Sequence, residues 1–256
     1  MTRRDDYYNR AKQEGYRARS AYKLKQLDDT AGVLPDDGTV VDLGAAPGGW
    51  LQVAAERVGP GGTVIGVDRQ RIDPVDAAAT VETIRGDMTD GETIAAITDR
   101  ADGVDAVCSD LAPNMTGEYS VDHARSIHLA RQAFSVAEAT LAAGGDFVAK
   151  VFDGPDLDDF EADIEASFEY VRRTVPEASR DSSSELYLIG KGYLTAPVRA
   201  GDRRTVEIVD AGDEGDGIAR IDGFALFVPA TEVGETVEIR VDEVKPTYGF
   251  AQRIDD

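Results

Sequence analysis

The chain has 256 residues, 42% of them hydrophobic, which is enough for one large domain with a core and a second small domain, and it holds no apolar run long enough to cross a membrane. Its single cysteine, Cys108, excludes an intramolecular disulfide and a cysteine-based metal site, and we expect it to be buried as a small apolar side chain. The net charge of −22, from 49 acidic and 27 basic residues, would argue against a nucleic acid partner. However, the acidic residues are spread over every segment, and this distribution indicates a surface adapted to a high-salt cytoplasm.

The first 26 residues are basic, in contrast to the rest of the chain. Residues 1–26 hold eight Lys or Arg against three Asp or Glu, a net charge of +5, with Tyr7, Tyr8, Tyr16 and Tyr22 between them. Such an arm predicts contact with a polyanion, and we expect Tyr22 to pack in the core. The alternative is a helix whose basic residues pair with the acidic body. The start lacks the apolar stretch of a secretory signal, so we expect a cytoplasmic protein.

Between residue 39 and about residue 193, strand-like and helix-like segments alternate. The expected strands are TVVDLG, TVIGVD, ETIRGD, DAVCSD, DFVAKVF and ELYLIGKGY, and the expected helices lie near 48–58, 91–100, 122–142 and 156–168. This alternation predicts an α/β fold, a Rossmann-like, doubly wound and mostly parallel sheet with helices on both faces. Four strands end in Asp or Asp-Leu-Gly, so we expect one acidic cleft at their carboxyl ends.

A glycine-rich loop lies in VVDLGAAPGGW, residues 40–50, where a strand meets a helix. Glycines let the backbone approach a ligand, but the spacing departs from G-x-G-x-x-G, so a dinucleotide pyrophosphate fits poorly. Asp68, 24 residues after Gly44, is placed to accept the hydroxyls of an adenosine ribose, and Asp87 to meet an adenine amino group. A nucleoside without phosphates suits such an acidic pocket, and S-adenosylmethionine, which is cationic at sulfur, is one.

Lys150 is the only lysine between residues 26 and 190, and it lies inside the apolar strand DFVAKVF. A lysine in such a strand either extends to the end of the sheet or is functional, and we favour function. Asp110 ends the neighbouring strand, before the loop LAPNMTG that is suited to a substrate pocket. Glu185 opens the last strand and Lys23 lies in the basic arm, but Asp110, Glu185 and Lys23 are each, taken alone, typical of a surface charge. We expect no metal, because no His/Cys cluster is present.

Beyond residue 202 the pattern changes to short period-2 segments separated by glycine or acidic turns. These segments are RTVEIVD, GIARI, FALFVP, TVEIRVDEV and GFAQRI. They predict a separate five-stranded β-barrel of about 55 residues, and Pro197 and Gly201 mark a linker before it.

The chain resembles the FtsJ/RlmE-type ribose 2′-O-methyltransferases, which act on large-subunit ribosomal RNA. The matching stretches, in order from about residue 7 to residue 193, are EGYRARSAYKL, VVDLGAAPGGW, GVD, GDMTD, CSDLAPNMTG, VDHARSIHLA, FVAKVFDG and SRDSSSELYLIGKG. The resemblance implies a catalytic tetrad of Lys23, Asp110, Lys150 and Glu185. It also implies contacts to S-adenosylmethionine at Gly48, Trp50, Asp68, Asp87 and Asp110. The C-terminal barrel resembles a TRAM domain, a small RNA-binding β-barrel related in shape to the OB-fold.

These resemblances imply a division into a basic arm packed on the catalytic domain (1–26), a methyltransferase domain (27–195), a linker (196–202) and a TRAM-like barrel (203–256). The implied reaction is in-line transfer of a methyl group to a uridine 2′-hydroxyl of 23S RNA within the large ribosomal subunit, by a monomer. The base of the target nucleotide would then stack on the tyrosines or arginines of the basic arm. Lys150 acts either as a neutral general base or as a charged group that orients the hydroxyl. The alternatives are a transfer-RNA ribose 2′-O-methyltransferase and, from another class, a non-catalytic RNA-binding ribosome-assembly factor.

Overall fold

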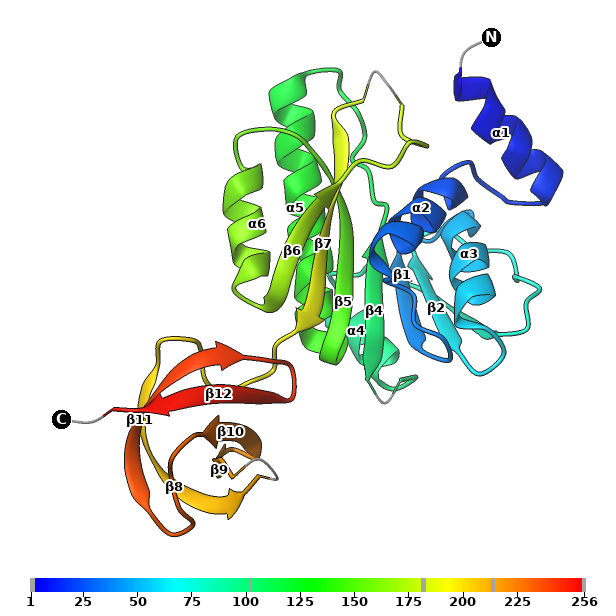
Figure 1. Cartoon of the computed structure of the whole chain (residues 1–256). Helices are drawn as coiled ribbons and strands as arrows, with labels where there is room; N and C mark the ends of the chain where they lie inside the picture. The colour runs from blue at the N-terminus through cyan, green and yellow to red at the C-terminus, as the bar shows by residue number, and fades with distance from the viewer. Residues whose placement is uncertain (1–2, 102, 181–182, 213–214, 255–256) are drawn as a thin grey trace.

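The computed structural model describes residues 3–101, 103–180, 183–212 and 215–254 of the chain, which form a seven-stranded sheet with helices and a closed barrel (Figure 1). The helices are α1 (Arg3–Glu14), α2 (Ala21–Ala31), α3 (Gly49–Val58), α4 (Gly91–Thr98), α5 (Tyr119–Thr140) and α6 (Leu157–Glu165). The strands of the sheet are β1 (Thr39–Leu43), β2 (Thr63–Asp68), β3 (Thr80–Arg85), β4 (Val104–Ser109), β5 (Leu141–Phe152), β6 (Phe168–Thr174) and β7 (Glu185–Tyr193). The strands of the barrel are β8 (Arg203–Ala211), β9 (Gly217–Ile221), β10 (Phe224–Val228), β11 (Thr236–Val244) and β12 (Tyr248–Arg253). Among these helices, none combines the length and the apolar content needed to cross a bilayer.

The sheet has the strand order β3-β2-β1-β4-β5-β7-β6. Strands β1 to β5 are parallel, and β7 is antiparallel to both of its neighbours. The mostly parallel, doubly wound sheet predicted from the sequence is therefore confirmed. The order reverses between β1 and β4, and in open α/β sheets this switch point is where a crevice forms outside the carboxyl ends of the strands.

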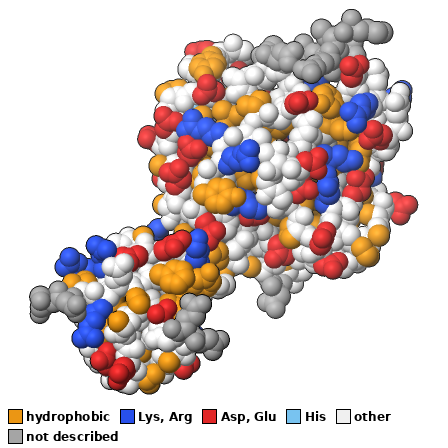
Figure 2. All heavy atoms as spheres, in the orientation of Figure 1, with side chains coloured by type: hydrophobic (Ala, Val, Ile, Leu, Met, Phe, Trp, Pro, Cys, Tyr) orange, Lys and Arg blue, Asp and Glu red, His pale blue; other side chains and the backbone are white. Residues whose placement is uncertain are grey.

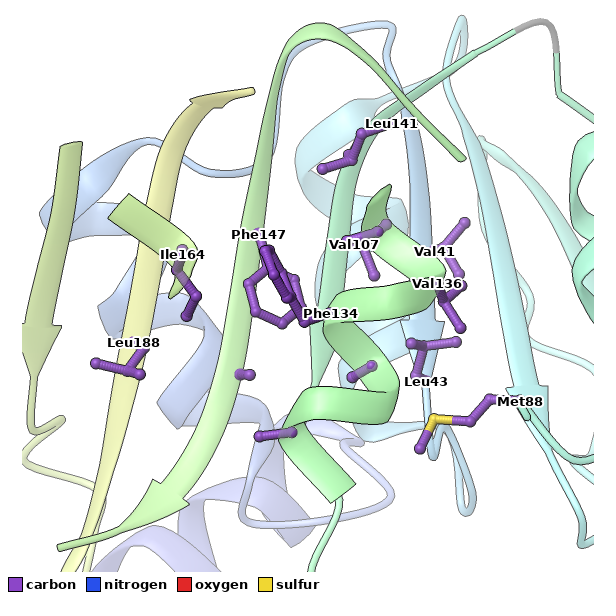
Figure 3. Close-up of a cluster of buried hydrophobic side chains, with 14 of the residues drawn as sticks. Val41, Leu43, Met88, Val107, Phe134, Val136, Leu141, Phe147, Ile164 and Leu188 are labelled. Atoms are coloured by element: carbon purple, nitrogen blue, oxygen red, sulfur yellow. The ribbon is translucent and has the colours of Figure 1, made fainter. Parts of the chain in front are cut away.

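Helices cover both faces of the sheet because successive strand residues point to opposite sides. Val41 and Leu43 of β1 pack with residues of α5 and α6 on one face, whereas Val40 packs with α2 and α3 on the other. Figure 3 shows the first of these cores, in which the ring of Phe134 from α5 lies 5.5 Å from the ring of Phe147 in β5. Burial of each such side chain stabilises the fold by roughly 1.5–3 kcal/mol, so α5 is held firmly against β5.

The structure differs from the sequence prediction at the antiparallel edge. The helix expected over 156–168 ends at Glu165, and residues 168–174 form the edge strand β6, which the sequence did not predict. Most side chains of β6 are exposed because this strand pairs only with β7. Its sequence, FEYVRRT, therefore lacks the apolar run that marks the central strands.

The barrel is closed, in the order β10-β12-β11-β8-β9, and confirms the predicted five-stranded unit. It approaches the sheet at the end opposite the carboxyl ends of the parallel strands (Figure 1). Lys245, just after β11, forms an ion pair of 3.6 Å with Glu169 of β6, and Pro246 lies close to Gly144 near the start of β5. Arg199 in the connection donates a hydrogen bond to the carbonyl of Ala166.

Candidate active site

The glycine-rich loop between β1 and α3 is enclosed on two sides. A Cβ on Gly44, whose φ is 80°, would lie 2.4 Å from Cδ2 of Leu111, and a Cβ on Gly48, whose φ is 109°, would lie 2.7 Å from Nη1 of Arg17. Arg17 also donates a hydrogen bond of 3.2 Å to the carbonyl of Pro47. Only glycine adopts these positive φ values without strain and fits the small space at both positions, so neither position carries a side chain.

A cavity of about 880 Å³ lies at the carboxyl ends of β1, β2 and β3, and Asp68 and Asp87 line it. We call it the larger cavity. Asp68 accepts hydrogen bonds from the backbone N–H groups of Ala46 (3.0 Å) and Gln70 (2.7 Å). Asp87 accepts them from the backbone N–H (3.1 Å) and the hydroxyl (2.8 Å) of Thr89, and these bonds lower the pKa of Asp87. Both carboxylates are thus held in fixed positions, and both lie in one cavity.

Three of the five predicted cofactor contacts, Gly48, Trp50 and Asp110, do not line the larger cavity. The Trp50 side chain is 3% exposed, its Nε1 donates to the carbonyl of Ser20 (2.8 Å), and its ring centroid is 6.0 Å from that of Tyr187. The indole therefore packs beneath the site and supports α2 and β7. Its predicted contact with a cofactor stays a prediction.

A second cavity of about 580 Å³, the smaller cavity, lies beside the ends of β5 and β7. Lys23, Lys150 and Glu185 line it. Ala112 lines both cavities, so the loop that follows Asp110 forms a wall that they share.

Lys150 and Asp110 meet at this wall. Nζ of Lys150 donates to the backbone carbonyl of Asp110 (2.6 Å) and to its Oδ1 (3.0 Å), and the hydroxyl of Tyr187 donates to the same Oδ1 (2.6 Å). Lys150 and Tyr187 are partners in the β5–β7 register, which explains why both reach one carboxylate. Burial, and then the charge of Asp110, raise the pKa of Tyr187, so its hydroxyl remains a donor.

Lys23 and Glu185 complete the cluster. Nζ of Lys23, on α2, lies 2.6 Å from Oε1 of Glu185 at the start of β7 and 4.0 Å from Oδ1 of Asp110. The Lys23 ammonium also lies 5.8 Å from the centre of the Tyr187 ring, within range of a cation–π contact. The structure thus brings together all four residues of the predicted tetrad, with two positive charges matched by two negative ones.

Two other titratable groups lie beneath the site. Asp42 of β1 is 2% exposed, and its Oδ2 has no hydrogen-bond partner among the described residues. Burial, and then the charges of Asp110 and Asp68, raise its pKa well above the usual value, which favours the protonated form. Cys108 is buried as predicted, and burial raises the pKa of its thiol. The described residues contain no group of three His, Cys, Asp or Glu side chains that could hold a metal ion.

Sequence reasoning missed the role of Asp122 in holding the loop after Asp110. Its Oδ1 accepts hydrogen bonds from the backbone N–H (2.8 Å) and hydroxyl (2.9 Å) of Thr116, and its Oδ2 accepts one from the N–H of Gly117 (3.0 Å). The bond from the Thr116 N–H is the main cause that lowers the pKa of Asp122. The start of α5 therefore fixes one side of the smaller cavity.

Two further residues of α5 hold the chain just after Lys150. His123 is 1% exposed, its Nδ1 lies 2.9 Å from the carbonyl of Phe152, and the N–H of Asp156 donates to its Nε2 (3.1 Å). One turn earlier on the same helix face, the hydroxyl of Tyr119 donates to the carbonyl of Asp153 (2.6 Å). No sequence pattern indicates these contacts, because they join a helix to a turn about 30 residues away.

The tyrosines of the basic arm lie away from both cavities. Tyr22 is 4% exposed, and the rings of Tyr7 and Tyr16 lie 5.3 Å and 5.8 Å from its ring, so its predicted core packing is confirmed. Desolvation is the main cause that raises the pKa of Tyr22 to about 12. Tyr8 is exposed, and its stacking on RNA stays a prediction.

Three aromatic rings of the barrel form a cluster on its outer side. Phe227 of β10 pairs with Phe250 of β12 in the strand register, and Tyr248 lies two residues before Phe250 on the same side. The three ring centroids are 5.6–5.9 Å apart, and Tyr248 and Phe250 are exposed. Figure 2 shows hydrophobic side chains gathered on the barrel where it approaches the larger part of the molecule.

A doubly wound sheet whose switch point carries a bare glycine loop and acidic strand ends, beside a buried cluster of paired charges, defines a Rossmann-like methyltransferase. The chain belongs to the FtsJ-like methyltransferase family, whose sequence profile matches residues 16–193. The profile of the TRAM domain matches residues 197–254.

Relatives align with the chain over nearly all of its length. A protein of Haloarcula marismortui is 64% identical over all of both chains, and one of Natronomonas pharaonis is 61% identical over all of both chains. A protein of Methanocella arvoryzae is 48% identical over 99% of this chain and 97% of its own. All three are named ribosomal RNA large subunit methyltransferase E, and the first two come from halophilic archaea.

A solved structure supports the fold of the catalytic part. It is a ribosomal RNA methyltransferase from Plasmodium falciparum, with a TM-score of 0.61 and 26% identity, covering 70% of this chain and 98% of that one. The α/β fold therefore extends to a relative whose sequence is only distantly similar.

Proposed function

We propose that this protein transfers the methyl group of S-adenosylmethionine to the 2′-hydroxyl of a uridine ribose in 23S RNA of the large ribosomal subunit. The observation that carries the proposal is the meeting of Lys23, Asp110, Lys150 and Glu185 at the wall shared by two cavities. The name that the relatives share supports the substrate class.

The larger cavity suits S-adenosylmethionine, which supplies a methyl group bonded to a positively charged sulfur. Asp68 and Asp87 offer carboxylates to the ribose hydroxyls and the adenine amino group, and Gly44, which also lines this cavity, places no side chain in it. Asp110 adds a negative charge at the wall. We therefore assign the cofactor to the residues that the family resemblance names, with Trp50 contributing through its backbone.

The smaller cavity would hold the nucleotide to be methylated. Two of the positions around Nζ of Lys150 are taken by Asp110, and the third is available to a 2′-hydroxyl. The hydrogen bond from Tyr187 and the nearby Lys23–Glu185 pair keep Asp110 in place, so that Lys150 is oriented before substrate arrives. Such preorganisation is a main source of catalysis in transfer reactions.

Two charge states of Lys150 fit this geometry. As a neutral amine it accepts the proton of the hydroxyl; as an ammonium ion it donates its third N–H to the oxygen, and the proton leaves to Asp110 or to water. The pH dependence of a single turnover separates them. A rate that rises with pH until the amine is neutral supports the base, whereas a rate that falls as lysine loses its proton supports the charged form.

The proposal as a whole is tested with labelled S-adenosylmethionine in multimolar KCl, offered with undermethylated large subunits, free large-subunit RNA and transfer RNA. Labelling of one ribose 2′-oxygen in the subunits is the expected result. Labelling of transfer RNA alone would assign the protein to transfer-RNA modification. Absence of transfer with RNA binding intact would favour an assembly factor without catalysis.

We propose the division of the chain into the arm 1–26, the catalytic domain 27–195, the linker 196–202 and the barrel 203–256. We also propose that it acts as a monomer in the cytoplasm. One chain forms both cavities, which supports the monomer.

A further inference from the structure

The smaller cavity must accept more than a hydroxyl. In a ribonucleotide the base is bonded to the carbon next to the one that carries the 2′-hydroxyl, so a ribose held at Lys150 places its base in the same cavity. The volume of about 580 Å³ lies within the range of about 300–1,000 Å³ usual for small-molecule sites. A nucleotide that enters it leaves its neighbours in the RNA, and the lost base stacking has to be replaced.

The arm tyrosines, which the sequence suggested for this purpose, do not line the smaller cavity, but Tyr119 and Met115 do. Tyr119 is 56% exposed and Met115 is 61% exposed, so the apolar surface of both residues is accessible to a ligand. The aromatic contacts between described residues do not include the Tyr119 ring, so its faces are available to a ligand.

The Tyr119 ring is also fixed in position. Its hydroxyl donates to the carbonyl of Asp153, in the turn just after β5, and its backbone opens α5. The loop that carries Met115 is held by the hydrogen bonds from Thr116 and Gly117 to Asp122. A ring fixed in this way loses little conformational freedom when a base stacks on it, which favours binding.

We propose that Tyr119, together with Met115, forms the stacking site for the base of the nucleotide that is methylated. This inference rests on the proposed function and names the recognition element of that site. The Tyr119 ring supplies a flat aromatic face, and the thioether of Met115 supplies an adaptable apolar contact. Arg180, which also lines this cavity and is exposed, supplies positive charge for the phosphodiester backbone.

The test compares Tyr119→Ala, Tyr119→Phe and Tyr170→Ala with the wild type, using undermethylated large subunits and labelled S-adenosylmethionine. Loss of the ring in Tyr119→Ala should lower kcat/KM for the subunits by about 5- to 150-fold, which corresponds to about 1–3 kcal/mol of stacking at 1.4 kcal/mol per tenfold. Tyr119→Phe keeps the ring and should retain most of the activity. Tyr170, an exposed tyrosine of β6 outside both cavities, is the matched control and should behave as the wild type.

Affinity for S-adenosylmethionine, measured by calorimetry, should be the same in all four proteins. The inference is overturned if Tyr119→Ala stays within twofold of the wild type. It is also overturned if Tyr119→Phe is as defective as Tyr119→Ala, because the hydroxyl bond to Asp153 and not the ring would then matter. A wild type that transfers no methyl group to RNA would instead refute the proposed function.

Discussion

Replacement of Lys150 by Met tests the centre of the site, because it removes the ammonium group and keeps most of the apolar stem. The side chain loses two hydrogen bonds to Asp110, and hydrogen bonds to charged groups contribute about 1.5–3 kcal/mol each to stability. Asp110 keeps the Tyr187 hydroxyl at 2.6 Å and Lys23 at 4.0 Å, so its charge is not left unpaired. The cost of burying the Lys150 ammonium is removed as well and offsets part of the two lost bonds, so we expect a net loss of about 1–3 kcal/mol in the free energy of unfolding.

The effect of Lys150→Met on the rate should be far larger. A general base contributes about 10²- to 10⁴-fold and a charge that stabilises a developing alkoxide about 10²- to 10³-fold, so either role predicts at least a 100-fold loss. The assay is a single turnover with saturating S-adenosylmethionine and undermethylated subunits. Unfolding of the same proteins by urea in KCl measures stability.

Lys191→Met is the control for the loss of a half-buried lysine. Lys191 of β7 pairs with Asp146 and donates to the carbonyl of Gly32 (2.9 Å), at the end of the sheet away from both cavities. The Lys191→Met substitution should lower the free energy of unfolding by a similar amount and leave the rate of methyl transfer unchanged. The reasoning is refuted if Lys150→Met remains within tenfold of the wild-type rate, or if Lys191→Met slows the reaction as much.

Three further changes have defined outcomes. Gly44→Ala places a Cβ at a residue with positive φ and against the side chain of Leu111, which costs about 1–3 kcal/mol. It should weaken S-adenosylmethionine binding about tenfold or more in calorimetry, and an unchanged affinity would contradict this expectation. Asp42→Asn should stabilise the protein by about 1–3 kcal/mol at pH 7 and by much less at pH 4. The reason is that the pKa of Asp42 is raised in the folded protein, so the stability of the wild type falls as the pH rises above the usual carboxyl value of 3.8. Urea titrations that give the same stability difference at both pH values would argue against this reasoning. The double substitution Tyr248→Ala and Phe250→Ala should weaken binding of large-subunit RNA at least fivefold in a filter assay and leave the affinity for S-adenosylmethionine unchanged. If the double variant binds this RNA as tightly as the wild type, the barrel rings are excluded as an RNA contact.

The central strands could be predicted because each is a short apolar run bounded by glycine or acidic residues. Lys150 could be singled out as the only lysine in a long stretch of sequence. Lys23 and Glu185 could be noted by position, but their catalytic role came only from the family resemblance, because the sequence does not distinguish either residue from an ordinary surface charge. The edge strand β6 escaped prediction because its side chains are mostly exposed.

Tyr119 and His123 could not be assigned from the sequence, for a physical reason. Their hydrogen-bond partners are backbone carbonyls and N–H groups after β5, and every residue has such groups. Only the packing of α5 against β5 determines which of them come within reach. Tyr7, Tyr16 and Tyr22 pack against one another in the arm, and the stacking of RNA bases on the arm stays a prediction.

The barrel lies at the opposite end of the sheet from the two cavities (Figure 1). An RNA that contacts both must therefore extend along the whole sheet, and a short oligonucleotide around the target can reach only one of them. The enzyme would in this way select its substrate by the separation of two RNA segments in a folded particle, a property that base sequence alone does not encode. Such selection by distance needs little net attraction, which suits an acidic protein in concentrated salt.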